Sequence, residues 1–210
     1  TVHKRTLLKA EQIEVRIDLL DLITNEINID KIEIHNATLH LFKGKDGLVN
    51  TAIFKAKPKK KNSESATTSS VNQIILEQVH FISENQLGNK LFDFDVIALK
   101  SKIDFETDDW NTNIYLKTIA KSMAFNAQRG TFIKDKVVEG ILKVNFSLVK
   151  NQISVSAEKL LIGKDLFNVK ANFSLDKNTS PFDIAIKTKI LWKDASDLLS
   201  ANISEKTNQF

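Results

Sequence analysis

The chain has no cysteine, two prolines, six glycines and no apolar run of the roughly 18 residues that a membrane helix needs. The lack of cysteine excludes a disulfide scaffold and a thiolate metal site. The low counts of proline and glycine exclude a low-complexity chain. The sequence shows no signal-peptide pattern and begins Thr1-Val2-His3 without a methionine. We therefore expect a piece of a longer protein whose targeting elements are missing.

The motifs of common enzyme classes are lacking as well. The sequence contains no HExxH, P-loop or GxSxG motif. Of the four histidines, His35 and His40 are five residues apart, so they would lie on opposite faces of an unbroken strand and could not share a metal. We predict no catalytic residues, no metal site and no cofactor, and therefore no enzyme.

The positive charge of the chain is concentrated in one segment. Five lysines fall within residues 55–61, and without them the formal net charge would change from +4 to −1. No aromatic residue is interleaved with these lysines, as would be typical of a nucleic-acid-binding surface. The segment continues into a polar Ser/Thr-rich run. We predict a flexible loop at about residues 56–70 and no nucleic-acid partner.

What the sequence does have is period-two alternation of apolar and polar residues, which is typical of strands with one apolar face. Alternation is seen in the segment that contains Ile13, Val15 and Ile17. In a later segment the phase of the alternation slips between Ile97 and Leu99, which predicts a bulge or a bend. We place Gly130 and Gly140 within strands, where glycine allows a bulge or a close backbone approach. The clearest alternation lies in four segments separated by short turns, as in an antiparallel meander: Val138–Leu148, Ile153–Ala157, Phe167–Leu175 and Phe182–Ile190.

These patterns predict one mainly β domain over residues 1–210, a length that can bury a core without division. We expect a curled antiparallel sheet, gutter-like or sandwich-like, with one or two short helices. The helices are placed at Leu19–Ile23 and Asp194–Leu199. Alternation alone does not decide whether the apolar face forms a closed core or an open gutter.

The order of these segments carries a resemblance. Residues 8–54 run through an alternating strand, a Leu19-Leu20-Asp21-Leu22 turn, further alternating residues and a Gly47-Leu48-Val49-Asn50 loop. Later blocks continue the same kind of apolar spacing: Met123–Gly130, Val138–Phe146, Leu160–Ile162, Phe167–Phe173 and Asp194–Ile203. This arrangement resembles AsmA-like proteins of Gram-negative bacteria, in particular the Bacteroidota type. The polar insertion at residues 55–71 departs from the family pattern.

AsmA-like proteins are anchored in the inner membrane by an amino-terminal helix and project into the periplasm. They are related in architecture to chorein-type bridge-like lipid transfer proteins, whose β-sheet gutter carries phospholipid. The resemblance therefore implies a non-enzymatic periplasmic protein that handles lipid and supports outer-membrane assembly. Its implied partners are phospholipid or another lipid, possible envelope proteins, and the inner membrane through a segment absent from this chain.

We predict that the lipid-binding face consists of apolar residues from three of the four clearly alternating segments. The candidate residues are Val138, Leu142, Val144, Phe146, Val169, Ala171, Phe173, Ile184 and Ile186. Acyl chains need apolar area and no directional contacts, so selectivity among lipids should be weak. The alternative is a structural or protein-interaction domain of the cell envelope, with a closed core and no lipid binding.

Overall fold

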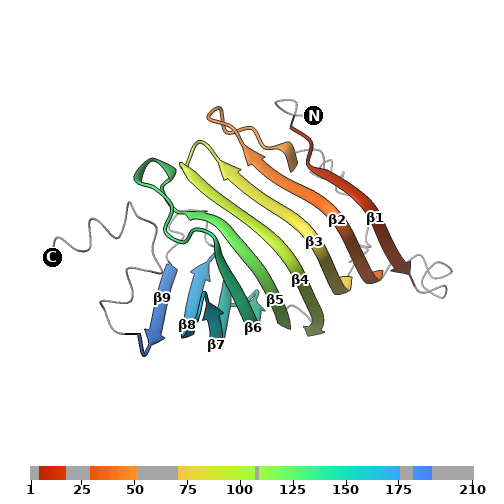
Figure 1. The fold of residues 1–210 in the computed structure, drawn as a ribbon. Helices are drawn as coiled ribbons and strands as arrows, with labels where there is room; N and C mark the ends of the chain where they lie inside the picture. Colours follow the sequence, from red (N-terminus) through yellow and green to blue (C-terminus); the bar gives the residue numbers. More distant parts are fainter. Residues whose placement is uncertain (1–4, 18–28, 52–70, 107–108, 176–181, 191–210) are drawn as a thin grey trace.

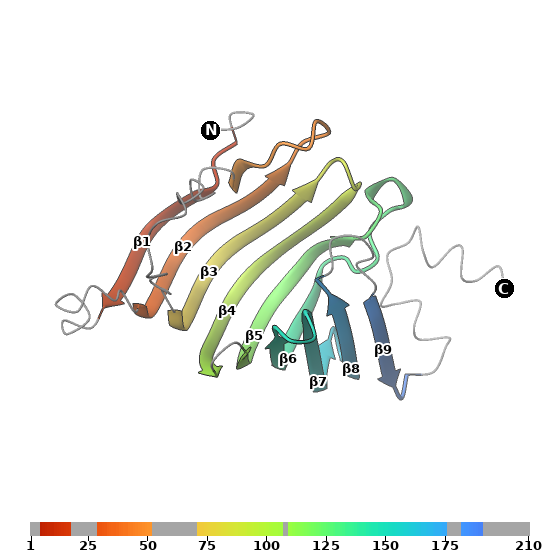
Figure 2. The same cartoon turned by 180° about the vertical axis from the view of Figure 1, so that it is seen from behind.

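The computed structural model describes residues 5–17, 29–51, 71–106, 109–175 and 182–190. These residues form nine strands: β1 (Leu8–Ile17), β2 (Ile29–Lys43), β3 (Val71–Asn85), β4 (Lys90–Glu106), β5 (Asp109–Ala124), β6 (Lys136–Ser147), β7 (Gln152–Ile162), β8 (Asp165–Ser174) and β9 (Phe182–Thr188). The strands make one sheet in chain order, and β6 to β9 are rotated relative to β1 to β5 (Figures 1 and 2). The predicted helices and the predicted loop at about 56–70 lie outside the described residues.

The predicted fold class is confirmed, because the chain is mainly β and its sheet is open and curled. The expectation of uniformly antiparallel pairing is wrong at one place, since β2 and β3 are parallel. A parallel pair requires a long connection that returns the chain to the same end of the sheet. In the sequence, residues 44–70 separate the two strands, and they include most of the polar insertion.

The prediction that Gly130 lies within a strand is wrong. The β5–β6 connection contains a short 3-10 helix, η3 (Ala127–Arg129), and Gly130 follows it with a φ of 99°. The side chain of Asn126 accepts a hydrogen bond from the Gln128 amide at 3.1 Å and so starts this turn. The local capping preference of asparagine therefore decides the structure here.

A line of irregular pairing crosses the sheet roughly at right angles to the strands, and we call it the crease. Asn36 of β2 and Gln78 of β3 lie side by side with φ values of 49° and 55°. The pairing of β4 with β5 shifts between Val96 and Ala98. Ile97, which lies between these two residues, is opposite Gln78 of β3 and so continues the line. The bulge predicted from the phase slip near Ile97 is therefore confirmed.

The crease continues across the second half of the sheet. Leu116 of β5 faces Gly140 of β6, and the register of β6 with β7 shifts beyond Glu139. The register of β7 with β8 shifts beyond Ala157. A Cβ atom on Gly140 would lie 3.0 Å from the carbonyl oxygen of Lys159, so the predicted close backbone approach is present. Because each bulge bends its strand, aligned bulges bend the whole sheet along one line.

The crease also keeps the apolar side chains on one face. In β1, Leu8 and Ala10 share that face on one side of the crease, while Ile13 and Val15 share it on the other. An unbroken strand would have turned one of these pairs outward. We call this apolar face the inner face and the opposite one the outer face.

Two buried clusters lie on the inner face. The first consists of Ala37, Val79 and Val96 at the crease of β2, β3 and β4. The second joins β5, β7, β8 and the β5–β6 connection: Ala120, Ile133, Ala157, Leu160, Ile162 and Phe167. Since the second cluster brings together strands that are not neighbours in the sheet, the inner face is concave there.

Candidate functional site

The pairing register places all nine predicted lining residues on the inner face. Leu142 faces Ile114, and Val144 lies between Thr112 and Val155, in line with the inward positions of β5 and β7. The other predicted residues of β6, β8 and β9 follow the same parity: Val138, Phe146, Val169, Ala171, Phe173, Ile184 and Ile186. The structure therefore brings the candidate set together on one surface.

Burial divides this surface into two parts. On the side of the crease that carries the β3–β4 turn, Val138 packs against the second buried cluster with Phe94 and Met123. The β5–β6 connection holds Ile133 in this cluster, because the Met123 amide donates a 3.0 Å hydrogen bond to the Ile133 carbonyl oxygen. We call this part the packed side, and its apolar residues are protein interior.

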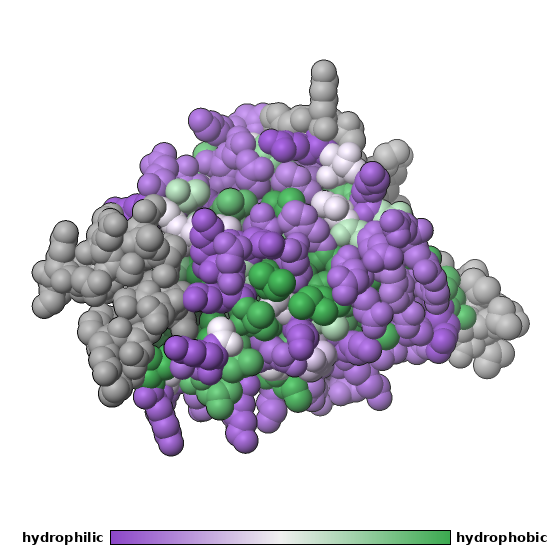
Figure 3. All heavy atoms as spheres, viewed as in Figure 1, coloured by the Kyte–Doolittle hydropathy of each residue, from purple (hydrophilic) through white to green (hydrophobic). Residues whose placement is uncertain are grey.

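Beyond the crease, apolar side chains of the inner face reach solvent. Ile186 is 57% exposed and Val15 is 52% exposed, although the register gives both residues inward positions. We call the exposed set the open inner surface: Ile13, Val15, Ile17, Phe105, Phe173, Ile184 and Ile186. Apolar side chains also gather in the middle of the view in Figure 3, bordered by polar ones.

Predicted lining residues differ in burial even beyond the crease. Val144, which is 9% exposed, and Ala171 are buried, whereas Phe173 is 37% exposed and Ile184 is exposed too. Val144 and Ala171 both face Val155 of β7 and have strands on each side. In contrast, β9 is an edge strand of the described sheet. The edge position of β9 accounts for the exposure of Ile184, whereas Phe173 is exposed although β8 has a strand on each side.

Part of the open inner surface was missing from the predicted set. Ile13, Val15 and Ile17 of β1 and Phe105 of β4 extend the same face. Their alternation is visible in the sequence, but the parity change at the crease hides the fact that they share a face with β8 and β9. The phase slip near Ile97 could have identified these residues, if it had been interpreted as one bend shared by many strands.

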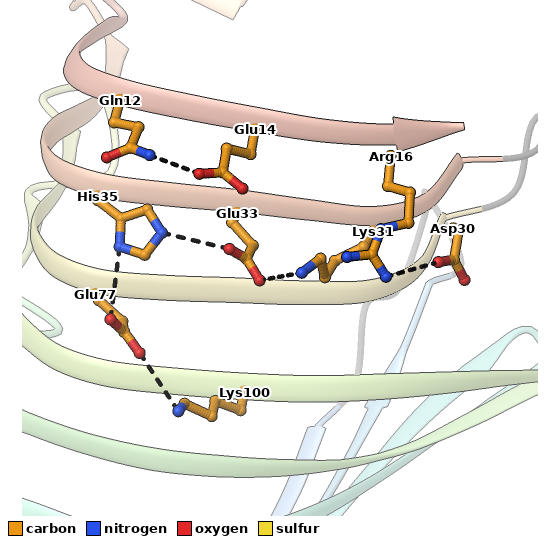
Figure 4. Close-up of polar contacts among 9 residues, drawn as sticks. All are labelled: Gln12, Glu14, Arg16, Asp30, Lys31, Glu33, His35, Glu77 and Lys100. Carbon is orange, nitrogen blue, oxygen red and sulfur yellow. Dashed lines mark hydrogen bonds and ion pairs between the residues drawn. The ribbon is translucent and has the colours of Figure 1, made fainter. Parts of the chain in front are cut away.

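The outer face of β1 to β4 carries a chain of charged groups (Figure 4). His35 Nε2 lies 3.5 Å from Glu33 Oε2, and His35 Nδ1 lies 3.5 Å from Glu77 Oε2. Lys100 Nζ is 3.3 Å from Glu77 Oε1, and Lys31 pairs with Glu33. The hydrogen bond from Lys31 lowers the pKa of Glu33 below its usual value of 4.5. In this arrangement each of these acidic side chains has a basic neighbour within ion-pair distance.

The prediction that His35 and His40 lie on opposite faces is wrong. The bulge at Asn36 shifts the parity of β2, so both imidazoles lie on the outer face. His40 Nε2 lies 3.4 Å from Glu84 Oε2, apart from the pairs that His35 makes. Within the described ranges, no group of three or more His, Cys, Asp or Glu side chains is placed to hold a metal ion.

The open inner surface is suited to apolar matter of no fixed shape. It is built from aliphatic and aromatic side chains on strands, and such a surface stabilises bound apolar groups in proportion to the area removed from water.

Where the structure describes the chain, none of its helices has the length and apolar character to cross a membrane. Comparisons with protein-family models, curated proteins and solved structures found no match to this chain.

Proposed function

We propose that this chain handles lipid without catalysing a reaction, and that it holds acyl chains on the open inner surface. The observation that carries this proposal is the exposure of inward-facing apolar residues at both ends of the sheet, from Val15 of β1 to Ile186 of β9. Large exposed apolar patches commonly mark a binding site. The open, curled sheet supports a gutter-like form for this surface.

The energetics favour a ligand with long apolar chains. Burial of apolar area contributes about 25 cal/mol per Å², or about 0.8 kcal/mol for each buried CH₂ group. A chain of many CH₂ groups can therefore bind without directional contacts. The residues of the open inner surface have no polar side-chain atoms that could recognise a lipid headgroup. We therefore expect different phospholipids to bind with similar affinity.

The wider role is proposed from the sequence resemblance to AsmA-like proteins. It places the chain in the periplasm as part of a protein anchored in the inner membrane, with outer-membrane assembly as the process it supports. An exposed apolar gutter is what such a role requires, since phospholipid must be shielded from water on its way between membranes. Envelope proteins are further proposed partners.

A structural or protein-interaction domain is the second candidate, and the packed side favours it. Ala120 and Phe167 are buried among side chains of four segments, as in an ordinary closed core. If parts of a longer protein covered the remaining inner face, the same residues would serve packing alone. The two functions therefore differ in what contacts Phe173, Ile184 and Ile186.

Lipid content decides between them. Protein purified from cells without detergent should yield phospholipid on solvent extraction, detected by mass spectrometry, and should bind a fluorescent phospholipid added afterwards. A matched β-rich protein with a closed core, treated identically, controls for carry-over. Lipid-free protein that also rejects the fluorescent phospholipid would leave the interaction domain as the better account.

A further inference from the structure

The two halves of the described sheet differ in charge. The described residues up to 106 hold nine Lys and Arg and eleven Asp and Glu, whereas those from 109 to 190 hold twelve Lys and Arg and six Asp and Glu. The lysine-rich segment at 55–61 contributes to neither count. The excess of positive charge in the β5–β9 half is therefore a property of the folded sheet.

In the first half, many of the outer-face charges are paired. Arg16 lies 3.8 Å from Asp30, and His80 Nε2 lies 2.8 Å from Asp93. Together with the chain of charged groups around Glu33 in Figure 4, these contacts pair many of the charges on β1 to β4. Paired charges of this kind offer little attraction to a charged partner.

In the second half, a row of lysines crosses the outer face of β6 to β9. Ser156 of β7 faces Lys143 on one side and Lys170 on the other. Lys187 of β9 faces Asn168, two positions along β8 from Lys170. All three lysines are exposed, and none has an ion pair with another residue of the described ranges. Unpaired like charges in a row cost repulsion unless an anionic partner neutralises them.

Apolar side chains lie beside this row on the same face. Ile141 is 57% exposed and faces Tyr115, and Leu166 is 58% exposed and faces Leu161. Val137 is exposed two positions before Glu139, which pairs with Lys117. We call the combined surface the outer patch: Tyr115, Val137, Ile141, Leu166, Lys143, Lys170 and Lys187. Strand alternation predicts a polar outer face, so these apolar side chains are unexpected.

We propose that the outer patch binds an anionic lipid surface. Each lysine near such a surface contributes about 1 kcal/mol, and aliphatic side chains beside the lysines can enter the headgroup region. Protein interfaces are enriched in aromatic residues, methionine and arginine and depleted in lysine. The outer patch has three lysines, one tyrosine and no arginine, methionine or tryptophan, which favours lipid over a protein partner. This function goes beyond acyl-chain binding because it uses the opposite face of the sheet.

The test uses vesicle flotation with the full chain. Vesicles of phosphatidylcholine alone are compared with vesicles that also contain phosphatidylglycerol, at low and high salt. Because Lys55, Lys57, Lys59, Lys60 and Lys61 could bind anionic vesicles by themselves, every protein carries Gln at these five positions. We expect binding to the anionic vesicles only, and weaker binding at high salt because salt screens exposed charges.

The decisive variant combines Lys143→Gln, Lys170→Gln and Lys187→Gln. It should lower the partition constant about 100-fold, which corresponds to about 1 kcal/mol for each lysine. The control combines Lys9→Gln, Arg16→Gln and Lys100→Gln, which removes the same charge from the outer face of β1 to β4 and should retain most of the binding. Ile141→Ser with Leu166→Ser should also weaken binding.

Uptake of a fluorescent phospholipid by the lysine variant should equal that of its parent, because the inner face is unchanged. Equal losses in the two triple variants would overturn the proposal and leave only a general effect of net charge. Equal binding to both kinds of vesicle would overturn it as well. An absence of binding to anionic vesicles would assign the outer patch to a protein partner instead.

Discussion

The packed side and the open inner surface are built from the same alternating pattern, yet they differ in burial. Phe167 and Ile186 occupy inward positions on neighbouring strands, and they are 7% and 57% exposed. Phe167 belongs to a buried cluster that includes residues of β5, β7 and the β5–β6 connection. Ile186 lies on the edge strand β9. Alternation thus assigns a face, whereas the bend and the position in the sheet decide whether a residue stabilises the fold or remains available to a ligand.

The largest expected effect is loss of stability on the packed side. Phe167→Ala should lower the free energy of unfolding by about 3 to 5 kcal/mol, because it removes a large side chain and leaves a cavity. Ile186→Ala is the matched change on the open inner surface and should cost within about 1 kcal/mol. Urea denaturation followed by circular dichroism measures both. Equal losses would show that the two parts do not differ in packing.

The crease should be the next most sensitive feature. Gly140→Ala introduces a Cβ atom that would lie 3.0 Å from the backbone oxygen of Lys159, so a strand has to move. We expect a loss of about 1 to 3 kcal/mol in the free energy of unfolding, typical of overpacking. Gly88→Ala is the control, because its close neighbour is the movable side chain of Asn85. A Gly140→Ala protein as stable as the parent would argue against tight packing at the crease.

Substitutions on the outer face should have the smallest effect on stability, and this effect should depend on pH. The hydrogen bonds from Lys117 and Tyr115 lower the pKa of Glu139 below its usual value of 4.5. The stability from this carboxylate is therefore present above about pH 4.5 and is lost as the pH falls through the lowered value. Glu139 also raises the pKa of Lys117, whose contribution is lost only in strongly alkaline solution.

Thermal unfolding between about pH 6 and about pH 3 checks this pH dependence. Glu139→Gln should reduce the fall in melting temperature over that range. Glu158→Gln, at an exposed carboxylate that has no ion pair with another described residue, serves as the control. The same acid-induced fall in the parent and in Glu139→Gln would mean that the Lys117–Glu139 pair does not contribute to stability.

Much of the fold could be predicted, because strand alternation is a local signal. The runs around Val144 and Phe173 identified β6 and β8 and the face that each side chain takes. The parallel pairing of β2 with β3 could not be predicted, because it depends on a connection that brings distant segments together. The phase slip near Ile97 indicated one bulge, but Gln78 at a positive φ carries no sequence preference for that conformation.

The face on which the candidate site lies could be predicted from strand alternation, but the exposure of its residues could not. All nine lining residues occupy the inner face, but their exposure depends on curvature and on the edge position of β9, which no local pattern records. His35 and His40 show the same limit, since one bulge at Asn36 reverses the inference drawn from their spacing. Residue type and parity are local properties, whereas burial is set by the bend of the whole sheet.

The central claim is that the inner face beyond the crease is open and holds acyl chains. Aspartate introduced singly at Val144, Phe173 and Ile186 tests it, with melting temperature measured beside uptake of a fluorescent phospholipid. Val144→Asp should unfold the domain, because it buries an unpaired charge at a cost of several kcal/mol. Phe173→Asp and Ile186→Asp should remain folded and take up less phospholipid. Unfolding of all three variants would contradict the claim and indicate a closed interaction domain.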